Sequence, residues 1–140
     1  MNPKNSSPVA DVRQFAMLLS STRRGARLAR LLTVQQLIEW DTSCDAAHHV
    51  VAELAANAVL HGHVAGRDFR LALGLSEGGT LRVEVADTRG EAMPQVGRGS
   101  GPEAETGRGL LLVEAMADRW GVAARQGPGK TVWAEFDLGR

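Results

Sequence analysis

The sequence predicts an α/β two-layer sandwich, in which a mixed, mainly antiparallel sheet of about five strands is covered on one face by three helices. Several segments alternate between apolar and polar residues, which is typical of strands with one buried face. Two long segments instead repeat their apolar residues with a helical period, and a glycine-rich stretch precedes a third. Both kinds of segment in 140 residues indicate one domain.

The amino-acid composition indicates an ordinary globular protein and argues against several other classes of protein. Hydrophobic residues make up 44% and charged residues 23% of the chain, as in an ordinary globular protein. Sixteen basic and sixteen acidic residues give no net charge, which argues against a nucleic-acid-binding protein. The single cysteine, Cys44, cannot form an internal disulfide, and no apolar run is long enough for a membrane span or a signal peptide. We therefore expect a cytoplasmic protein that contacts neither membrane nor nucleic acid directly.

The chain is expected to begin with a flexible arm, a strand and a helix. Residues 1–10 are polar and contain proline, so we expect an arm there and a single domain over residues 11–140. Alternating apolar residues predict a strand over residues 15–19. Ser20-Ser21-Thr22 can then cap a helix, which is predicted over residues 23–40.

The first half of this helix is basic, which opposes the helix dipole, so helix propensity does not explain it. The basic residues are Arg23, Arg24, Arg27 and Arg30. They indicate either a solvated face or a surface for an acidic protein partner or a phosphate. The apolar residues spread over a wide arc, so the helix is either covered by its own domain or partly buried against another subunit.

The second helix is expected over residues 44–60, with Gly62 as its C-terminal glycine. Its apolar stripe runs through Ala47, Val50, Val51, Leu54, Ala55 and Ala58. Glu53, Asn57 and His61 follow one another at steps of four, so they lie along one line of the helix surface. Glu53 and Asn57 stand at the edge of the stripe, where a protein can line a pocket. A carboxylate beside an amide oxygen suits Mg²⁺ or a catalytic base, although the same pair is common on exposed helices.

A β-hairpin is predicted over residues 69–75 and 81–85, joined by the turn Glu77-Gly78-Gly79. Asp87 follows on the same face as the apolar residues of the second strand. A buried carboxylate is unfavourable unless something donates to it. Asp87 is therefore either the cap of a turn or an acceptor for a ligand group such as an exocyclic amine.

A connection of about twenty residues, 89–109, is rich in glycine, and such a length is typical of a functional lid or of disorder. It leads through Gly107-Arg108-Gly109-Leu110 into a helix expected to end near Asp118. Glycines at a helix start let the backbone approach a ligand, and the N–H groups there favour an anion. Arg98 and Arg108 could add charge to a bound phosphate. The alternative is a plain glycine linker.

Two final strands are expected over residues 120–125 and 131–138. Between them, Gly129-Lys130-Thr131 imitates the end of a Walker A loop. However, Ala124 stands where that loop has its first glycine, and the segment opens a strand where a Walker loop opens a helix. No P-loop is therefore predicted.

Taken in order, these motifs resemble those of the Bergerat-fold ATPases, a group that includes DNA gyrase, histidine kinases and mismatch-repair ATPases. The similarity covers about residues 12–138 and is greatest to short anti-sigma-factor serine/threonine kinases and related ATP-binding regulators of actinobacteria. The matching motifs are Glu53-Leu54-Ala55-Ala56-Asn57-Ala58, His61-Gly62, Asp87, Gly107-Arg108-Gly109-Leu110 and Thr131.

The resemblance implies a role for each of these positions. Asn57 would hold Mg²⁺, and Glu53 would be the base that activates a hydroxyl or a water. Asp87 would accept a hydrogen bond from the amino group of adenine, with support from Thr131 directly or through water. The ATP phosphates would lie against a lid that includes Arg98, Gly107, Arg108, Gly109 and Leu110. Phosphoryl transfer depends mainly on positioning and charge neutralisation, which these groups would supply.

The resemblance further implies a kinase that phosphorylates a small anti-sigma-factor antagonist on Ser or Thr, binds a sigma factor and forms a homodimer. One position departs from the family pattern, because Arg89 stands where the family usually has glycine, two residues after the adenine-binding aspartate. Arg89 therefore leaves open a second function, a nucleotide-sensing interaction module with little or no phosphotransfer.

Two other functions fit the sequence less well. A detached histidine-kinase catalytic domain would follow a helical hairpin bearing a phosphoacceptor histidine, whereas His48 and His49 lie on the nucleotide-site helix itself. A metal site built from these two residues with His61 and His63 has no Cys-x-x-Cys motif beside it. Packing at a helix end explains the histidines more simply.

Overall fold

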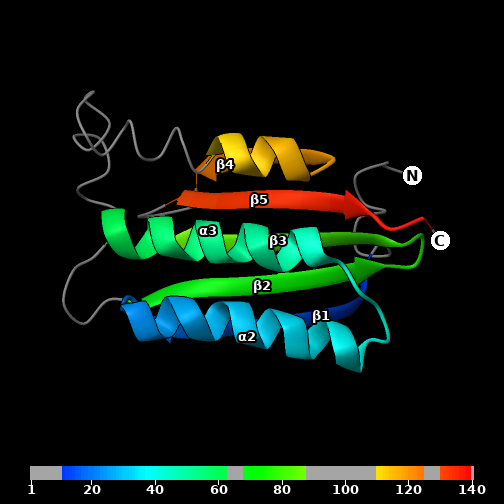
Figure 1. Ribbon diagram of the computed structural model, residues 1–140, viewed down its shortest axis with the longest axis horizontal. Helices are drawn as coiled ribbons and strands as arrows, with labels where there is room; N and C mark the ends of the chain where they lie inside the picture. The colour runs from blue at the N-terminus through cyan, green and yellow to red at the C-terminus, as the bar shows by residue number, and fades with distance from the viewer. Residues whose placement is uncertain (1–10, 63–67, 88–109, 125–129, 140) are drawn as a thin grey trace.

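The computed structural model describes residues 11–62, 68–87, 110–124 and 130–139, which form a five-stranded sheet with helices beside it (Figure 1). The strands are β1 (Asp11–Ser20), β2 (Asp68–Ser76), β3 (Thr80–Asp87), β4 (Arg119–Ala124) and β5 (Lys130–Asp137). The helices are α2 (Arg23–Glu39), α3 (Asp45–Gly62) and a short helix over residues 110–116. Every strand and helix expected from the sequence is present, with bounds shifted by a few residues.

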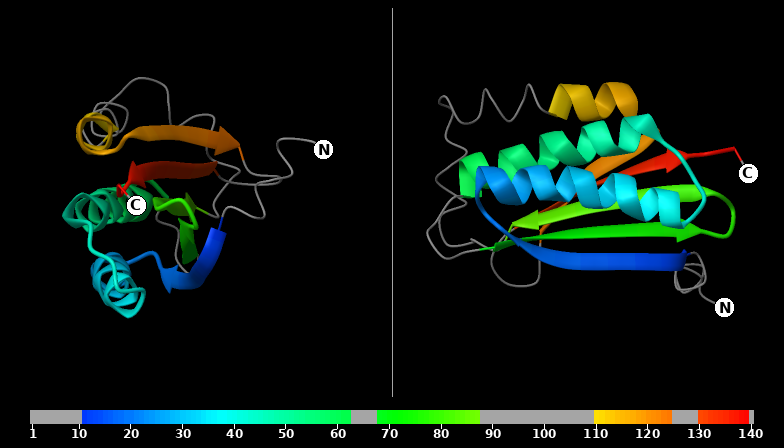
Figure 2. Two further views of the ribbon diagram at one scale, coloured as in Figure 1. Left: turned by 90° about the vertical axis from the view of Figure 1, so that its right-hand side faces the viewer. Right: turned by 60° about the horizontal axis from the view of Figure 1, so that its bottom comes forward.

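The sheet has the strand order β1-β2-β3-β5-β4, and all four neighbouring pairs are antiparallel. Figure 2 shows α2, α3 and the helix at residues 110–116 on one side of the sheet, with no described helix on the other side. The predicted two-layer sandwich with a mainly antiparallel sheet is confirmed. Because β5 lies between β3 and β4, the next strand after β3 in the chain is the edge strand β4, and β5 then pairs with both β3 and β4.

The start of α2 is fixed against the end of β1. Thr22 Oγ1 accepts a hydrogen bond from the N–H of Gly25 at 3.0 Å, as the capping sequence predicted. A Cβ atom on Gly25 would lie 1.9 Å from the carbonyl oxygen of Ser20, which no real contact allows. Only glycine therefore lets the helix begin this close to the strand.

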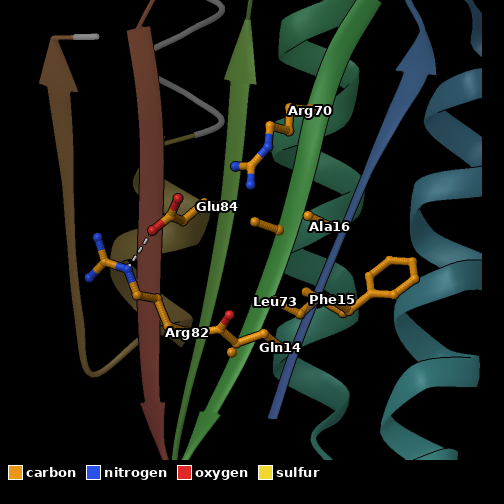
Figure 3. A pocket seen from close by; sticks show the side chains of 9 residues that line it. Gln14, Phe15, Ala16, Arg70, Leu73, Arg82 and Glu84 are labelled. Atoms are coloured by element: carbon orange, nitrogen blue, oxygen red, sulfur yellow. Dashed lines mark hydrogen bonds and ion pairs between the residues drawn. The ribbon is translucent and has the colours of Figure 1, made fainter. Parts of the chain in front are cut away.

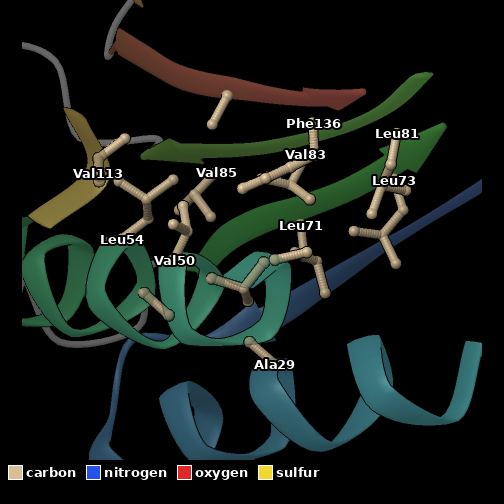
Figure 4. Close-up of a cluster of buried hydrophobic side chains, with 14 of the residues drawn as sticks. Ala29, Val50, Leu54, Leu71, Leu73, Leu81, Val83, Val85, Val113 and Phe136 are labelled. Atoms are coloured by element: carbon tan, nitrogen blue, oxygen red, sulfur yellow. The ribbon is translucent and has the colours of Figure 1, made fainter. Parts of the chain in front are cut away.

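Helix α3 lies over the middle of the sheet and supplies the centre of the core. The apolar stripe expected from the sequence is buried along its whole length. Figure 4 shows Val50 and Leu54 of α3 packed among side chains of the strands, which include Leu71 and Val85. Removal of this apolar surface from water is the main stabilising contribution to the fold.

Helix α2, in contrast, is covered on one side only. Its buried residues are Gly25, Ala29, Thr33 and Leu37. On the outer side, Leu28, Leu31 and Ile38 are 41%, 54% and 64% exposed. Even so, none of the described helices is long and apolar enough to cross a membrane. The described part of the domain does not cover the wide apolar arc, so burial of this arc against another subunit stays a prediction.

Candidate functional site

Helix α3 presents Glu53 and Asn57 at the edge of the core, as their spacing predicted. Both residues are half-buried, whereas Leu54 and Ala58, each one position further along, are 2% and 7% exposed. A polar side chain at such an edge can reach a cavity without losing contact with the core. The side chain of His61, the third residue of the line, lies outside the described part of the structure.

Asp87 ends β3 inside the molecule. Its side chain is on the same face as Val83 and Val85, which are at most 3% exposed, and Asp87 itself is 8% exposed. Among the residues that the structure describes, it is the only buried residue with an acidic or basic side chain. Because burial of a carboxylate is unfavourable, such a position indicates a functional role more often than an exposed aspartate does.

A pocket lies between α3 and the sheet, and residues of α3 and of the end of β3 both line it. Three positions that the sequence predicted, Asn57, Asp87 and Leu110, line this pocket. Its other lining residues are Leu54, Ala58, Val85, Val122, Lys130 and Val132. Apolar walls with a few polar groups at one edge suit a flat ligand that has one polar edge of its own.

Other predicted site residues do not line this pocket. Glu53 precedes Asn57 by one helical turn and is not among the residues that line the pocket. Thr131 pairs with Ala86 across the ladder between β3 and β5, so strand alternation directs it to the face opposite Asp87. The pocket therefore does not include the expected support of Asp87 by Thr131. The predicted lid residues Arg89, Arg98, Gly107, Arg108 and Gly109 lie outside the described residues.

Lys130 is a pocket residue that the sequence motifs did not reveal. It opens β5, and alternation with Val132, Ala134 and Phe136 places it on the helix-covered face. This alternation is visible in the sequence. What the sequence does not show is that the first residue of β5 lies beside the last residue of β3.

The side-chain oxygens at the pocket suit a magnesium ion that is coordinated mainly by a bound substrate and by water. Asn57 offers an amide oxygen at the edge. In the described ranges, no cluster of three His, Cys, Asp or Glu side chains could hold a metal. Mg²⁺ keeps several waters and takes only one or two protein oxygens together with substrate phosphates. The residues present therefore fit Mg²⁺ brought by a nucleotide better than a dedicated metal centre.

A second hollow, of about 420 Å³, lies on the open face of the sheet (Figure 3). Small residues form its floor, where Ala16 pairs with Ala72 and Gln14 pairs with Gly74. Arg70 stands at its rim. None of the residues that the sequence predicted for the functional site lies here.

Two of the charged residues that line this hollow, Arg82 and Glu84, form an ion pair. Arg82 donates to Glu84 at 2.7 Å and to Glu135 at 2.9 Å, and its guanidinium lies 4.4 Å from the ring centre of Trp133. Burial alone would lower the pKa of Arg82, but the hydrogen bonds with the two glutamates raise it. These charges are therefore already paired within the protein, and the open face is the weaker candidate for a ligand site.

Comparison with known proteins agrees with the architecture. The family model of the histidine kinase-like ATPase domain matches residues 10–136. Twelve chains of solved structures match, among them the RsbU and RsbW domains of Rv1364c from Mycobacterium tuberculosis, with a TM-score of 0.69. That match has 22% sequence identity over 92% of this chain and covers 33% of the other chain, so it shows a shared fold. No curated protein matches.

Proposed function

The chain belongs to the family of histidine kinase-like ATPase domains, and from this premise we propose that it is an ATP- and Mg²⁺-dependent regulator of protein partners, acting as a serine/threonine kinase of the anti-sigma-factor type. The observation that carries the proposal is the pocket in which Asn57 and Asp87 meet between α3 and the sheet. Family membership accounts for the binding of ATP, and the kinase activity and its partners form the finer part of the proposal.

In this proposal the adenine ring enters between α3 and the sheet. Val85, Val122 and Val132 offer apolar contact to the ring. Val122 is 52% exposed, and a bound base would cover it. The Asp87 carboxylate is an acceptor only, so it suits the exocyclic amino group of adenine. Thr131 is left out of this contact, because strand alternation directs it to the other face of the sheet.

The phosphates lie toward Asn57, whose amide oxygen would hold Mg²⁺. When bound, the ion would neutralise charge on the phosphate oxygens. The backbone of Gly107 and Gly109 and the side chains of Arg98 and Arg108 would surround the phosphates, as the resemblance implies. These lid contacts rest on the sequence.

Glu53 is the proposed catalytic base. It lies one turn before Asn57 on α3, so its carboxylate is close to the end of the pocket that would take the phosphates. It would accept the proton of a Ser or Thr hydroxyl while that oxygen bonds to the γ-phosphorus and ADP leaves. A protein that only bound nucleotide would need no such base, so Glu53 favours phosphoryl transfer.

The proposed partners are an anti-sigma-factor antagonist, which would accept the phosphate, and a sigma factor, which would be bound. Their identity rests on the sequence resemblance. The exposed residues Leu28, Leu31 and Ile38 on α2 support a homodimer, because clustered exposed apolar side chains mark protein contact sites.

A second candidate function is a nucleotide-sensing interaction module with little or no phosphotransfer. The observation that favours it is Arg89, which replaces the glycine usually found after the adenine-binding aspartate. A bulky residue there would alter the turn beside the base, while leaving Asn57 and Asp87 able to bind nucleotide.

Calorimetric titration with ATP and Mg²⁺ tests the site. We expect Asn57→Ala and Asp87→Ala each to weaken binding by about ten- to hundredfold, because a hydrogen bond to a charged group contributes about 1.5–3 kcal/mol. Gln35→Ala, on the outside of α2, is the matched control for the amide, and Glu77→Ala, in an exposed turn, is the control for the carboxylate. Equal affinity in all four variants would contradict the proposed site.

Formation of ADP, together with transfer of the γ-phosphate to a serine-containing acceptor protein, distinguishes the two functions. Glu53→Gln should lower the turnover by about a hundredfold or more while changing ATP affinity less than about threefold, because a general base acts only in the chemical step. Glu39→Gln, at the exposed end of α2, is the matched control. A wild-type protein that binds ATP and forms neither ADP nor a phosphorylated product, even with serine-containing acceptor proteins, would favour the sensing module.

A further inference from the structure

Lys130 and Asp87 face each other at the end of the ladder between β3 and β5. The register pairs Val85 with Val132, and two more steps along both strands bring Asp87 opposite Lys130. In an antiparallel pair, directly opposite Cβ atoms lie about 4.5–5.5 Å apart. Both residues line the pocket proposed for the base. A cationic donor therefore stands beside the acceptor that would recognise the ligand.

The ammonium of Lys130 is available to a ligand. Lys130 is half-buried, and it takes part in none of the ion pairs found in the described part of the chain. Its flexible four-carbon chain can direct the ammonium along the end of the pocket. In contrast, Arg82 and Arg119, on the other face of the sheet, are held by carboxylates.

A carboxylate alone discriminates between purine bases. It accepts a hydrogen bond from the 6-amino group of adenine but repels the 6-oxygen of guanine, which is itself an acceptor. An ammonium beside the carboxylate supplies the missing donor, because lysine carries three donors and no acceptor. The carboxylate alone matches the amino group of adenine, whereas the carboxylate and the ammonium together match N1–H and O6 of guanine.

We propose that Lys130 broadens the base specificity of this site, so that the protein binds both 6-amino and 6-oxo purine nucleoside triphosphates. The inference rests on the proposed nucleotide function and adds a ligand class to it. In bound GTP, Lys130 donates to O6 while Asp87 accepts from N1–H. In bound ATP, Asp87 accepts from the amino group, and Lys130 makes no hydrogen bond to the base.

Calorimetric titration of the wild-type protein with Mg²⁺ and ATP, GTP or ITP measures this specificity. We expect Kd values for GTP and ITP within about tenfold of that for ATP, since Lys130 supplies the donor that a 6-oxygen needs beside the carboxylate. ITP has the 6-oxygen and N1–H of guanine without its 2-amino group, so it isolates the contact to Lys130. Binding of ATP without binding of GTP or ITP overturns the inference and leaves the proposed function standing.

Lys130→Met keeps the length of the side chain and removes its charge. It should weaken GTP and ITP by about ten- to hundredfold and ATP by less than about threefold, because only a 6-oxo base loses a hydrogen bond from the lysine. Lys130→Arg should retain GTP binding. Arg70→Met removes the same charge from the open face and should change neither affinity.

Two outcomes of the variant titrations overturn the inference. An equal loss of ATP and GTP in Lys130→Met would mean that the lysine contacts a group common to both nucleotides. An equal loss of GTP in Lys130→Met and Arg70→Met would mean a general charge effect. If the wild-type protein bound neither ATP nor GTP, the proposed function would fail and the inference with it. Thermal unfolding of each variant, monitored by circular dichroism, establishes that the titrated protein is folded.

Discussion

The two faces of the sheet use charged residues in opposite ways. On the open face, Arg82 and Arg119 both contact Glu135, so each charge has an opposite charge beside it. On the helix-covered face, Asp87, Asn57 and Lys130 line a largely apolar pocket. The same strands supply both sets, since alternate residues point to opposite sides. Charges on one face stabilise one another, and the carboxylate on the other face can serve a ligand.

The comparison also concerns stability. Ion pairs at a protein surface typically contribute less than about 1 kcal/mol each, because solvent screens them and long side chains lose freedom. Buried apolar side chains contribute several times more. The face that carries most of the charged contacts should therefore contribute least to the free energy of unfolding, and three substitutions test this order.

The largest effect is expected for the helix-covered face. Leu71 of β2 is fully buried, and Leu71→Ala should lower the free energy of unfolding by about 2–5 kcal/mol through lost contacts and a cavity. Leu18→Ala is the matched control, because Leu18 is 58% exposed on β1 and pairs with Arg70 of the open face. It should change stability by less than about 0.5 kcal/mol. Urea unfolding measures both, and equal losses would contradict the comparison.

A smaller effect is expected where the open face is tightly packed. A Cβ atom on Gly121 of β4 would lie 2.8 Å from the ring of Trp133, which in turn stacks on Arg82. Gly121→Ala should displace the ring and lower the free energy of unfolding by about 1–3 kcal/mol. In Gly78→Ala the new Cβ would meet nothing nearer than 3.9 Å, so this control should remain as stable as the wild type. Equal stability of both variants would show that the ring moves freely.

The smallest effect is expected for a carboxylate of the open face. Burial alone would raise the pKa of Glu135, but hydrogen bonds from Arg119 and Arg82 hold it below its usual range. Because the folded state favours the ionised carboxylate, this group stabilises the fold at pH values above its pKa in the unfolded state, about 4.3. The contribution disappears as the pH falls through the pKa of the folded state.

Glu135→Gln should therefore lower the free energy of unfolding at pH 7 by less than about 1 kcal/mol, and the difference should shrink below about pH 4. Urea unfolding at a series of pH values measures the difference. Glu77→Gln, in an exposed turn, is the control and should show no such pH dependence. A difference that stayed constant from pH 7 to pH 3 would rule out the ionised carboxylate as its cause.

Local rules predicted most of the fold and three of the nine residues that line the pocket. The cap at Thr22 and the alternation over residues 81–85 depend only on neighbours in the chain, so α2 and β3 begin where they were expected. The helical period of α3 likewise placed Asn57 at the edge of the core, and strand parity placed Asp87 inside.

Contacts between distant segments could not be predicted in this way. Lys130 and Thr131 are adjacent, and only the register of β5 against β3 decides which of them faces Asp87. A slip of one residue would exchange them, because the side-chain period of a strand is two. The exposure of Leu31 on α2 has a similar origin, since it depends on which other segments cover the helix.

The strand order has a consequence for how the protein behaves in concentrated solution. β1 is a ten-residue strand at one edge of the sheet, and no other described strand pairs with its outer side. It also exposes Met17 and Leu18, at 40% and 58%. A long apolar edge of this kind is a template on which a strand of another molecule can add. Aggregation of this protein is therefore expected to start at β1, and Leu18→Lys should suppress it by the device that natural edge strands use.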